Sequence, residues 1–137
     1  MTNTHSVVIE KDYPYPPEKV WRALSEGPLL QQWLMKNDFQ PTPGRAFQFR
    51  VDPVQGWNGI IDCKVINVEP GKTLSYTWVT MGLESVVTFT LTPTASGSHL
   101  RMEHSGFPSD KDAAYKGATY GWTNFLSSLE RVVSELN

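Results

Sequence analysis

The C-terminal stretch, residues 109–136, carries a long run of helical periodicity. Its apolar residues recur in steps of three and four, which places them on one stripe of an α-helix: Ala118, Trp122, Phe125, Leu126, Leu129, Val132, Val133 and Leu136. Ser109, followed by Asp112 three positions later, forms a capping-box pattern that marks the helix start. A helix from Asp110 to Leu136 would be about 40 Å long, at about 1.5 Å per residue. Such a helix needs a long apolar surface to pack against.

The middle of the chain alternates with period two, which is typical of strands with one buried face. Five alternating groups follow one another between turn signals: Phe47, Phe49 and Val51; Ile61, Cys63 and Val65; Leu74, Tyr76 and Trp78; Val87, Phe89 and Leu91; Leu100, Met102 and His104. The segment Glu69-Pro70-Gly71-Lys72 is a tight-turn sequence, because Pro presets φ and Gly tolerates positive φ. We therefore predict an antiparallel meander whose apolar face must be covered.

The N-terminal part predicts one more strand and two short helices. Residues 7–12 form a β-like run that ends at prolines, which cannot continue a central strand. Pro17 suits the first turn of a helix, and Pro28 separates this helix from a second one that contains Trp33. The predicted order is thus one strand, two short helices, five strands and one long helix. This order favours an α+β fold, a curved antiparallel sheet of about six strands wrapped around the C-terminal helix.

Length, charge and cysteine content narrow the class of protein. We expect residues 1–137 to form a single domain. The net charge of −2 argues against a nucleic-acid binder driven by bulk positive charge and against a protein of anionic membrane surfaces. One cysteine, Cys63, excludes an intrachain disulfide and fits a reducing compartment. Because no signal peptide and no apolar run of about 18 residues is visible, we expect no membrane span and a cytoplasmic location.

The order and spacing of several short motifs resemble a known family. The motifs are Pro17 with Val20-Trp21-Arg22-Ala23-Leu24; Trp33; Pro43-Gly44 before Phe47 and Phe49; residues 65–70 with Leu74-Ser75-Tyr76-Thr77-Trp78; His104-Ser105-Gly106-Phe107; and Gly121-Trp122 with Phe125, Leu126 and Leu129. Together they span nearly the whole chain and resemble the SRPBCC superfamily, also described as START-like or birch-pollen-allergen-like. Within it, the chain is most similar to the branch named after the activator of the heat-shock-protein-90 ATPase.

The resemblance implies a helix-grip fold with a cavity between the sheet and the long helix. Relatives use such cavities for lipids, sterols, polyketides or other apolar ligands, and some are enzymes of the aromatase/cyclase type. The eukaryotic activator acts on its chaperone and carries a separate chaperone-binding domain. The resemblance therefore implies three kinds of function: ligand binding, catalysis and chaperone regulation.

Large side chains on the inward faces of these elements are the candidates for lining such a cavity. The candidate residues are Trp33, Phe47, Phe49, Trp57, Tyr76, Trp78, Phe89, Met102, His104, Tyr120, Trp122 and Phe125. Core packing is the alternative interpretation for most of them, because aromatic side chains dominate protein cores. Tyr76, Tyr120 and His104 would supply the few polar groups that orient a ligand. Trp57 lies in a glycine-flanked loop and would act as a gate or as a loop anchor.

His104 has two competing interpretations. It shares the inward side of its strand with Leu100 and Met102, so it is either a polar handle in an apolar pocket or a structural link between strand and helix. The sequence contains no phosphate loop, metal-binding helix, cysteine pair or nucleophile elbow, so we predict no catalytic residue and no cofactor. The histidines are scattered along the chain, so we predict no metal site.

Three functions follow as hypotheses. The first is binding of a small hydrophobic or amphipathic molecule, without catalysis. The second is a cyclase- or hydratase-type enzyme that uses His104 or a tyrosine as acid or base. The third is regulation of a chaperone, heat-shock protein 90, by protein interaction. A homodimer is a further hypothesis, because an open sheet has edges that need protection.

Two glycines interrupt the apolar pattern of the last helix. Gly117 and Gly121 each cost about 1 kcal/mol relative to Ala in a helix interior. We therefore expect a kink or a mobile turn in the first half of this helix, and an opening to the cavity beside Tyr120.

Overall fold

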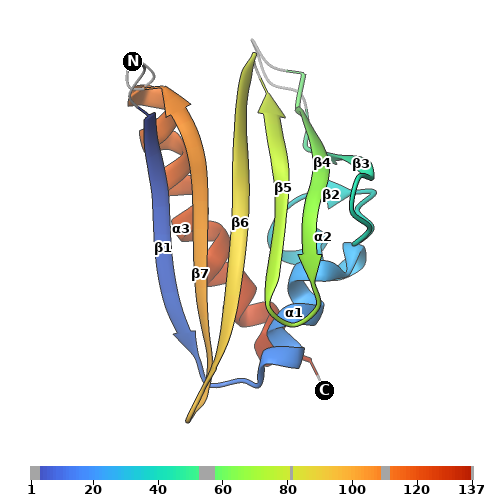
Figure 1. The fold of residues 1–137 in the computed structure, drawn as a ribbon, viewed down its shortest axis with the longest axis vertical. Coiled ribbons are helices and arrows are strands. Elements are labelled where there is room, and N and C mark those ends of the chain that lie inside the picture. The colour runs from blue at the N-terminus through green and yellow to red at the C-terminus, as the bar shows by residue number, and fades with distance from the viewer. Residues whose placement is uncertain (1–3, 53–57, 81, 109–111, 137) are drawn as a thin grey trace.

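The fold is built on one antiparallel sheet. The computed structural model describes residues 4–52, 58–80, 82–108 and 112–136. Within these, seven strands form the sheet in the order β1-β7-β6-β5-β4-β3-β2 (Figure 1). The strands are β1 (Thr4–Tyr13), β2 (Lys36–Asn37), β3 (Ala46–Arg50), β4 (Ile60–Glu69), β5 (Thr73–Thr80), β6 (Leu83–Thr94) and β7 (Gly97–Pro108). The predicted meander corresponds to β3 through β7, in which each strand pairs with the next.

A two-residue strand, β2, is the difference from the predicted sheet of about six strands. Lys36 pairs with Arg50 and Asn37 pairs with Phe49, so β2 extends the sheet at its β3 edge. Two residues are too few to produce an alternating pattern, which is why the sequence does not indicate this strand. Asn37 also donates hydrogen bonds from its side-chain amide to the carbonyl oxygens of Gly27 and Met35.

Three helices complete the fold: α1 (Pro17–Ser25), α2 (Gly27–Trp33) and α3 (Asp112–Ser134). Pro17 occupies the first turn of α1, as predicted. Glu26 is the C-cap of α1 and also the N-cap of α2, so Gly27 and Pro28 belong to the first turn of α2. The capping residue predicted for α3, Ser109, lies outside the described residues.

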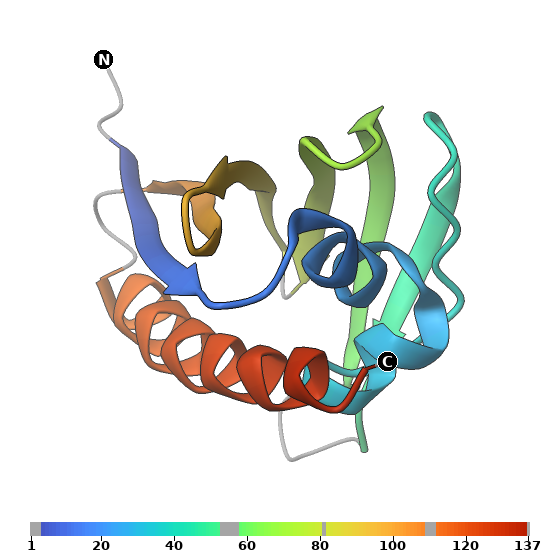
Figure 2. The same cartoon turned by 90° about the horizontal axis from the view of Figure 1, so that it is seen from below.

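The sheet curves over a layer of helices. Figure 2 shows α3 running beneath the β1 and β7 side of the curved sheet, while α1 and α2 lie under the remaining strands. The inward positions of the strands are buried, as the alternation predicts: Phe47, Phe49, Ile61, Cys63, Val65, Leu74, Tyr76, Trp78, Val87, Phe89, Leu91, Leu100, Met102 and His104. Val51 is the exception, because β3 ends at Arg50 and the Val51 side chain is exposed. The covering of the apolar face is therefore shared between α3 and the two short helices, whereas the sequence predicted a sheet wrapped around the C-terminal helix alone.

Hydrogen bonds far apart in sequence hold α3 against the N-terminal elements. The hydroxyl of Tyr13 donates to the carbonyl oxygen of Leu126 at 3.3 Å. Lys19 donates to the carbonyl oxygen of Leu136 at 3.0 Å, close to the C-terminus. The C-terminal half of α3 is buried along Leu126, Leu129, Val132 and Val133, the stripe that the periodicity predicts.

The predicted interruption of the last helix is not observed. α3 continues as a regular helix through Gly117 and Gly121. A Cβ atom added at Gly117 would meet no neighbour, and one added at Gly121 would lie 3.8 Å from Phe125. The helix tolerates both glycines because its regular hydrogen bonding and the buried residues beyond them hold it in place.

Candidate functional site

Aromatic side chains from the sheet and from the helices meet in the interior. We define the interior aromatic cluster as Trp33, Phe39, Phe47, Phe49, Tyr76, Trp78, Phe89 and Trp122, all of them buried. Strands β3, β5 and β6 supply most of the rings, α2 supplies Trp33 and α3 supplies Trp122. Neighbouring rings meet at centroid distances from 4.9 Å (Phe39 to Phe47) to 6.3 Å (Trp33 to Phe89), in edge-to-face or tilted arrangements. Aromatic rings in mutual contact therefore make up much of the interior between the two layers.

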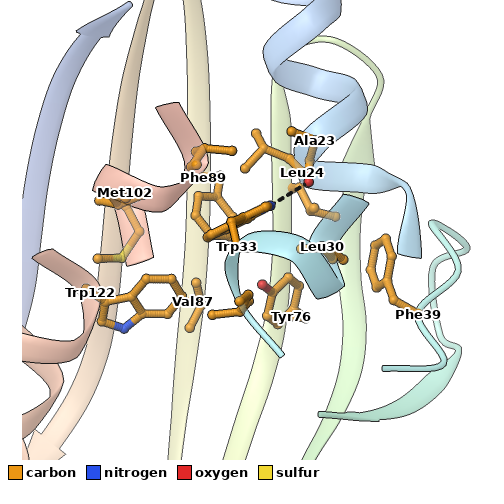
Figure 3. Close-up of a cluster of buried hydrophobic side chains, with 14 of the residues drawn as sticks. Ala23, Leu24, Leu30, Trp33, Phe39, Tyr76, Val87, Phe89, Met102 and Trp122 are labelled. Atoms are coloured by element: carbon orange, nitrogen blue, oxygen red, sulfur yellow. Dashed lines mark hydrogen bonds between the residues drawn. The ribbon is translucent and has the colours of Figure 1, made fainter. Parts of the chain in front are cut away.

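Trp33 shows how a short helix positions one of these rings. Its indole N–H donates to the carbonyl oxygen of Ala23 at 2.8 Å, which joins the end of α2 to α1 (Figure 3). With the nitrogen held by α1, the ring edge contacts Phe89 on β6. The indole therefore has its polar atom satisfied and presents apolar surface to the sheet.

Tyr76 lies at the centre of the interior aromatic cluster. Its ring contacts Phe47 at 5.2 Å, Phe49 at 5.9 Å, and Phe39 and Phe89 at 6.2 Å each. The side chain is completely buried, and its hydroxyl oxygen has no hydrogen-bond partner among the described residues. In Figure 3 this oxygen lies among apolar side chains, and no hydrogen bond reaches it. Burial raises the pKa of the Tyr76 phenol well above its usual value, so the group stays neutral and keeps its proton.

Cys63 is a second buried group on the inward face. It pairs with Phe47 across β3 and β4, and its thiol lies 3.8 Å from the carbonyl oxygen of Ile61. Burial, with the nearby carboxylates of Asp62 and Asp38, raises the pKa of the thiol. The thiol is therefore not ionised at neutral pH, so Cys63 acts as a small buried side chain in the alternating pattern of β4 rather than as a nucleophile.

His104 forms a hydrogen-bonded chain that joins four elements, α3, β7, β6 and β5. The indole N–H of Trp122 on α3 donates to Nδ1 of His104 at 2.9 Å. Because Nδ1 accepts, Nε2 carries the proton and donates to the hydroxyl of Ser85 at 2.7 Å. Ser85 in turn donates to the carbonyl oxygen of Trp78 at 3.0 Å. Each polar atom of this chain has the partner that its chemistry requires.

The structural interpretation of His104 fits this geometry better than the functional one. Both ring nitrogens are engaged within the protein, so neither is free to act on a ligand. Burial lowers the pKa of His104 to about 4, which keeps the imidazole neutral near pH 7. The side chain links β7 to β6 and to α3, and it lacks the free nitrogen that a general acid or base needs.

Among the described residues, the structure brings all of the predicted cavity residues together except Tyr120. The buried ones are Trp33, Phe47, Phe49, Tyr76, Trp78, Phe89, Met102, His104 and Trp122. Phe125 is partly buried and packs edge to face on Trp122 at 5.8 Å. Tyr120 is 74% exposed, so the prediction that it faces the cavity is wrong. It lies two positions before Trp122, about 200° away around a helix, and hence on the opposite face. Trp57 lies outside the described residues.

The sequence interpretation missed two buried residues of this region. Phe39 precedes a turn-rich segment, yet it is buried and its backbone N–H is held by the side chain of Asn37 at 3.0 Å. Its signal is weak, because a single aromatic residue has no periodicity. Ser85 had a clear signal: it shares the inward parity of Val87 and Phe89, and a polar residue at such a position needs a buried partner.

The interior holds little charge, and the ionic groups lie on the surface. The buried polar side chains of the described residues are Ser25, Ser75, Ser85, Ser98 and His104, with no Asp, Glu, Lys or Arg among them. On the exposed face, His99 contacts the carboxylates of Asp12 at 2.8 Å and Glu10 at 2.9 Å. These hydrogen bonds raise the pKa of His99. No cluster of His, Cys, Asp or Glu suited to a metal ion occurs in the described part of the chain.

None of the helices in the described residues is both long and apolar enough to cross a membrane.

Comparison with known proteins places the chain in a family. A family model described as activator of Hsp90 ATPase homolog 1-like protein matches residues 14–134. The crystal structure of MLL2253 from Mesorhizobium loti is 49% identical, over 97% of this chain and 99% of its own, with a TM-score of 0.91. BH1534 from Bacillus halodurans is 28% identical, over 97% of this chain and 99% of its own, with a TM-score of 0.82.

A third similar structure is longer than this chain. DynU16, from the dynemicin biosynthetic locus, is 25% identical over 95% of this chain but only 47% of its own length, with a TM-score of 0.81. No curated protein matches the sequence significantly.

The matched family model covers nearly all of the helix-grip fold described above, and the family expected from the sequence motifs is confirmed. The chain therefore belongs to the family of activator of Hsp90 ATPase homolog 1-like proteins.

Proposed function

We propose that this protein binds a small, largely apolar molecule between the sheet and the helices, and that it does not catalyse a reaction. The observation that carries the proposal is the buried hydroxyl of Tyr76, which has no partner among the described residues although it lies at the centre of the interior aromatic cluster. Buried polar groups are nearly always hydrogen-bonded, so each exception needs an explanation. A bound molecule that meets this hydroxyl would supply one.

The chemistry of the interior supports binding over catalysis. A cyclase or hydratase needs a proton donor or acceptor with a free site near the reacting atom. His104 was the best candidate, and Trp122 and Ser85 occupy its two nitrogens. The other buried titratable groups of the described residues, Tyr13, Cys63 and Tyr76, keep their protons because burial raises the pKa of each. Walls of aromatic rings with a few polar groups are typical of ligand sites.

The similar structures are in keeping with this proposal. DynU16 is described as a protein of the dynemicin biosynthetic locus, and a biosynthetic locus handles a small molecule. The family's name points instead to regulation of the Hsp90 ATPase. A pulldown from a lysate tests that alternative, since a chaperone regulator must retain Hsp90. The cytoplasmic location, the homodimer and the single domain stay predictions.

The experiment that tests binding compares two neighbouring valines on β6. Val87 is buried on the inward face, whereas Val86 is on the outward face and only partly buried. We expect Val87→Phe to take up space in the interior and to abolish binding, and Val86→Phe, the matched control, to keep it. Native mass spectrometry of the purified protein detects a retained apolar molecule. A thermal-shift screen then tests neutral apolar compounds, because a ligand that binds only the folded state raises the melting temperature of the protein.

The outcome of this comparison decides the proposal. Retained or added compounds that bind the wild type and Val86→Phe but not Val87→Phe support an interior site. If no compound binds the wild type, or if binding survives Val87→Phe in a variant that circular dichroism shows to be folded, the proposed function is wrong.

A further inference from the structure

The hydroxyl of Tyr76 is a group that the fold itself does not use. A phenylalanine at this position would make the same ring contacts with Phe47, Phe49 and Phe89 without burying an oxygen. An O–H group that is removed from water and left without a partner destabilises the folded state. Tyr13 is the opposite case within the same core, since its buried hydroxyl donates to the carbonyl oxygen of Leu126.

The surroundings of this hydroxyl offer no substitute partner among the described residues. Four of the neighbouring rings belong to phenylalanines, which have no polar atoms. The thiol of Cys63 is the donor of a hydrogen bond to the carbonyl oxygen of Ile61. The polar atoms of His104 and Ser85 are engaged with each other and with Trp122 and Trp78. The phenol is thus a free hydrogen-bond donor inside an apolar enclosure.

The same interior is unsuited to an ionised ligand. The buried side chains of the described residues include no lysine and no arginine that could pair with a carboxylate, and no aspartate or glutamate that could pair with a cation. An ion transferred from water to such a place loses its hydration without gaining a counter-charge. Fatty acids and other apolar anions are therefore disfavoured, although their chains are apolar.

We propose that the Tyr76 hydroxyl is the donor that anchors an uncharged ligand, one that offers a carbonyl or ether oxygen within an otherwise apolar skeleton. This inference rests on the proposed function and specifies it. The ligand's oxygen accepts one hydrogen bond from the phenol, and the rest of its surface contacts the interior aromatic cluster. The site selects against carboxylates of the same size.

The experiment uses three probes that share a skeleton of two phenyl rings joined through one carbon. Benzophenone has a carbonyl at that carbon, diphenylmethane has two hydrogens, and diphenylacetate bears a carboxylate. Binding to the wild type, Tyr76→Phe and Tyr13→Phe is measured by isothermal titration calorimetry at pH 7, and the melting temperature of each ligand-free protein is recorded. Tyr13→Phe is the matched control, because it removes a buried phenol that has a partner.

We expect the wild type to bind benzophenone about tenfold more tightly than diphenylmethane, the ratio that one net hydrogen bond produces, and diphenylacetate least tightly. Tyr76→Phe should bind benzophenone and diphenylmethane equally, whereas Tyr13→Phe should keep the preference. Without ligand, Tyr76→Phe should melt at the same temperature as the wild type or higher, and Tyr13→Phe should melt lower.

Two results would overturn the anchor role while leaving ligand binding intact. One is equal binding of benzophenone and diphenylmethane by the wild type, with no change in Tyr76→Phe. The other is a lower melting temperature of ligand-free Tyr76→Phe, which would mean that the hydroxyl has a structural partner such as a bound water. If the wild type binds none of the probes and the screen with the Val87 and Val86 variants finds no ligand either, the proposed function and this inference both fail.

Discussion

At the scale of single residues, the polar side chains of the interior fall into two kinds. His104 and Ser85 are embedded in a hydrogen-bonded chain that begins at Trp122 and ends at the carbonyl oxygen of Trp78. Tyr76 is buried equally well but stands outside that chain. Removing a member of the chain should therefore destabilise the fold, whereas removing the Tyr76 oxygen should not.

The first prediction concerns Ser85. Ser85→Ala leaves the Nε2–H group of His104 buried without an acceptor and frees the Trp78 carbonyl, so we expect a loss of about 1–3 kcal/mol in the free energy of unfolding. Urea denaturation measures this loss. Ser127→Ala is the control, because Ser127 is exposed on α3 and bonds only to a carbonyl of its own helix. A change in Ser85→Ala as small as that of the control would contradict the prediction.

The second prediction concerns the charge state of His104. The pKa is about 4 in the folded protein and about 6.5 in the unfolded chain, so between these values the unfolded chain binds more protons. The contribution of neutral His104 to the free energy of unfolding is therefore complete above about pH 6.5. It declines by about 3 kcal/mol in total as the pH falls toward 4. Denaturation between pH 7 and pH 5, above the range where most carboxylates titrate, should show a free energy of unfolding that rises more steeply with pH in the wild type than in His104→Gln, since His99 titrates in both proteins. Equal slopes in the two proteins would refute it.

At the scale of elements, α3 combines a tightly packed inner face with an outer face that few neighbours constrain. Trp122, Leu126 and Leu129 are buried against the sheet, while Gly117 and Tyr120 face outward. The start of β7 is the opposite case, since Gly97 has a positive φ of 156° and a Cβ atom added to it would overlap the carbonyl oxygen of Tyr13. Glycine is dispensable in the first element and required in the second.

The third prediction compares these glycines. Gly117→Ala places a Cβ where nothing lies within 4 Å and improves helix propensity, so it should stabilise the protein by about 0.5–1 kcal/mol. Gly97→Ala should lower the melting temperature, because its Cβ would overlap the carbonyl oxygen of Tyr13 and its backbone would be strained. Differential scanning calorimetry on both variants measures whether the melting temperature rises or falls relative to the wild type. A lower melting temperature of Gly117→Ala would contradict the prediction, because it would mean that the added methyl group is not tolerated in this turn of the helix.

At the scale of the whole molecule, the strands become shorter from β6 and β7 toward the β2 edge of the sheet. β6 and β7 are long, pair with neighbours on both sides and bury their inner faces. β2 and β3 are short and lie at one edge. Local stability follows buried contacts and backbone pairing, so it should decrease along the sheet from β6 toward β2.

The fourth prediction follows from this gradient. Native-state hydrogen exchange, read by NMR, should find the slowest amides in β6 and β7 and the fastest strand amides in β2 and β3. Addition of a ligand that binds the interior should slow exchange in β5 and in α3, which contribute Tyr76 and Trp122. Uniform protection across all seven strands would contradict the gradient.

The sequence predicted the fold well because its signals were periodic and long. Alternation placed the inward face of five strands, and the step of three and four placed Trp122, Leu126 and Leu129 on one side of α3. It could not predict β2, which has only two residues, nor the position of Phe39, which depends on a local hydrogen bond to Asn37. For the site, the alternation of side chains along β5 correctly placed Tyr76 on the buried face of the sheet. No pattern in the sequence reveals that its hydroxyl lacks a hydrogen-bond partner among the described residues.

The chain of hydrogen bonds through His104 has a consequence for proton movement. An indole N–H can only donate and a backbone carbonyl can only accept, so the two ends allow a single orientation of every group between them. A relay that conducts protons must be able to reverse its hydrogen bonds after each transfer, and this chain cannot. The chain through His104 therefore holds its side chains in one fixed arrangement and offers no path along which protons could be passed repeatedly from Trp122 to Trp78.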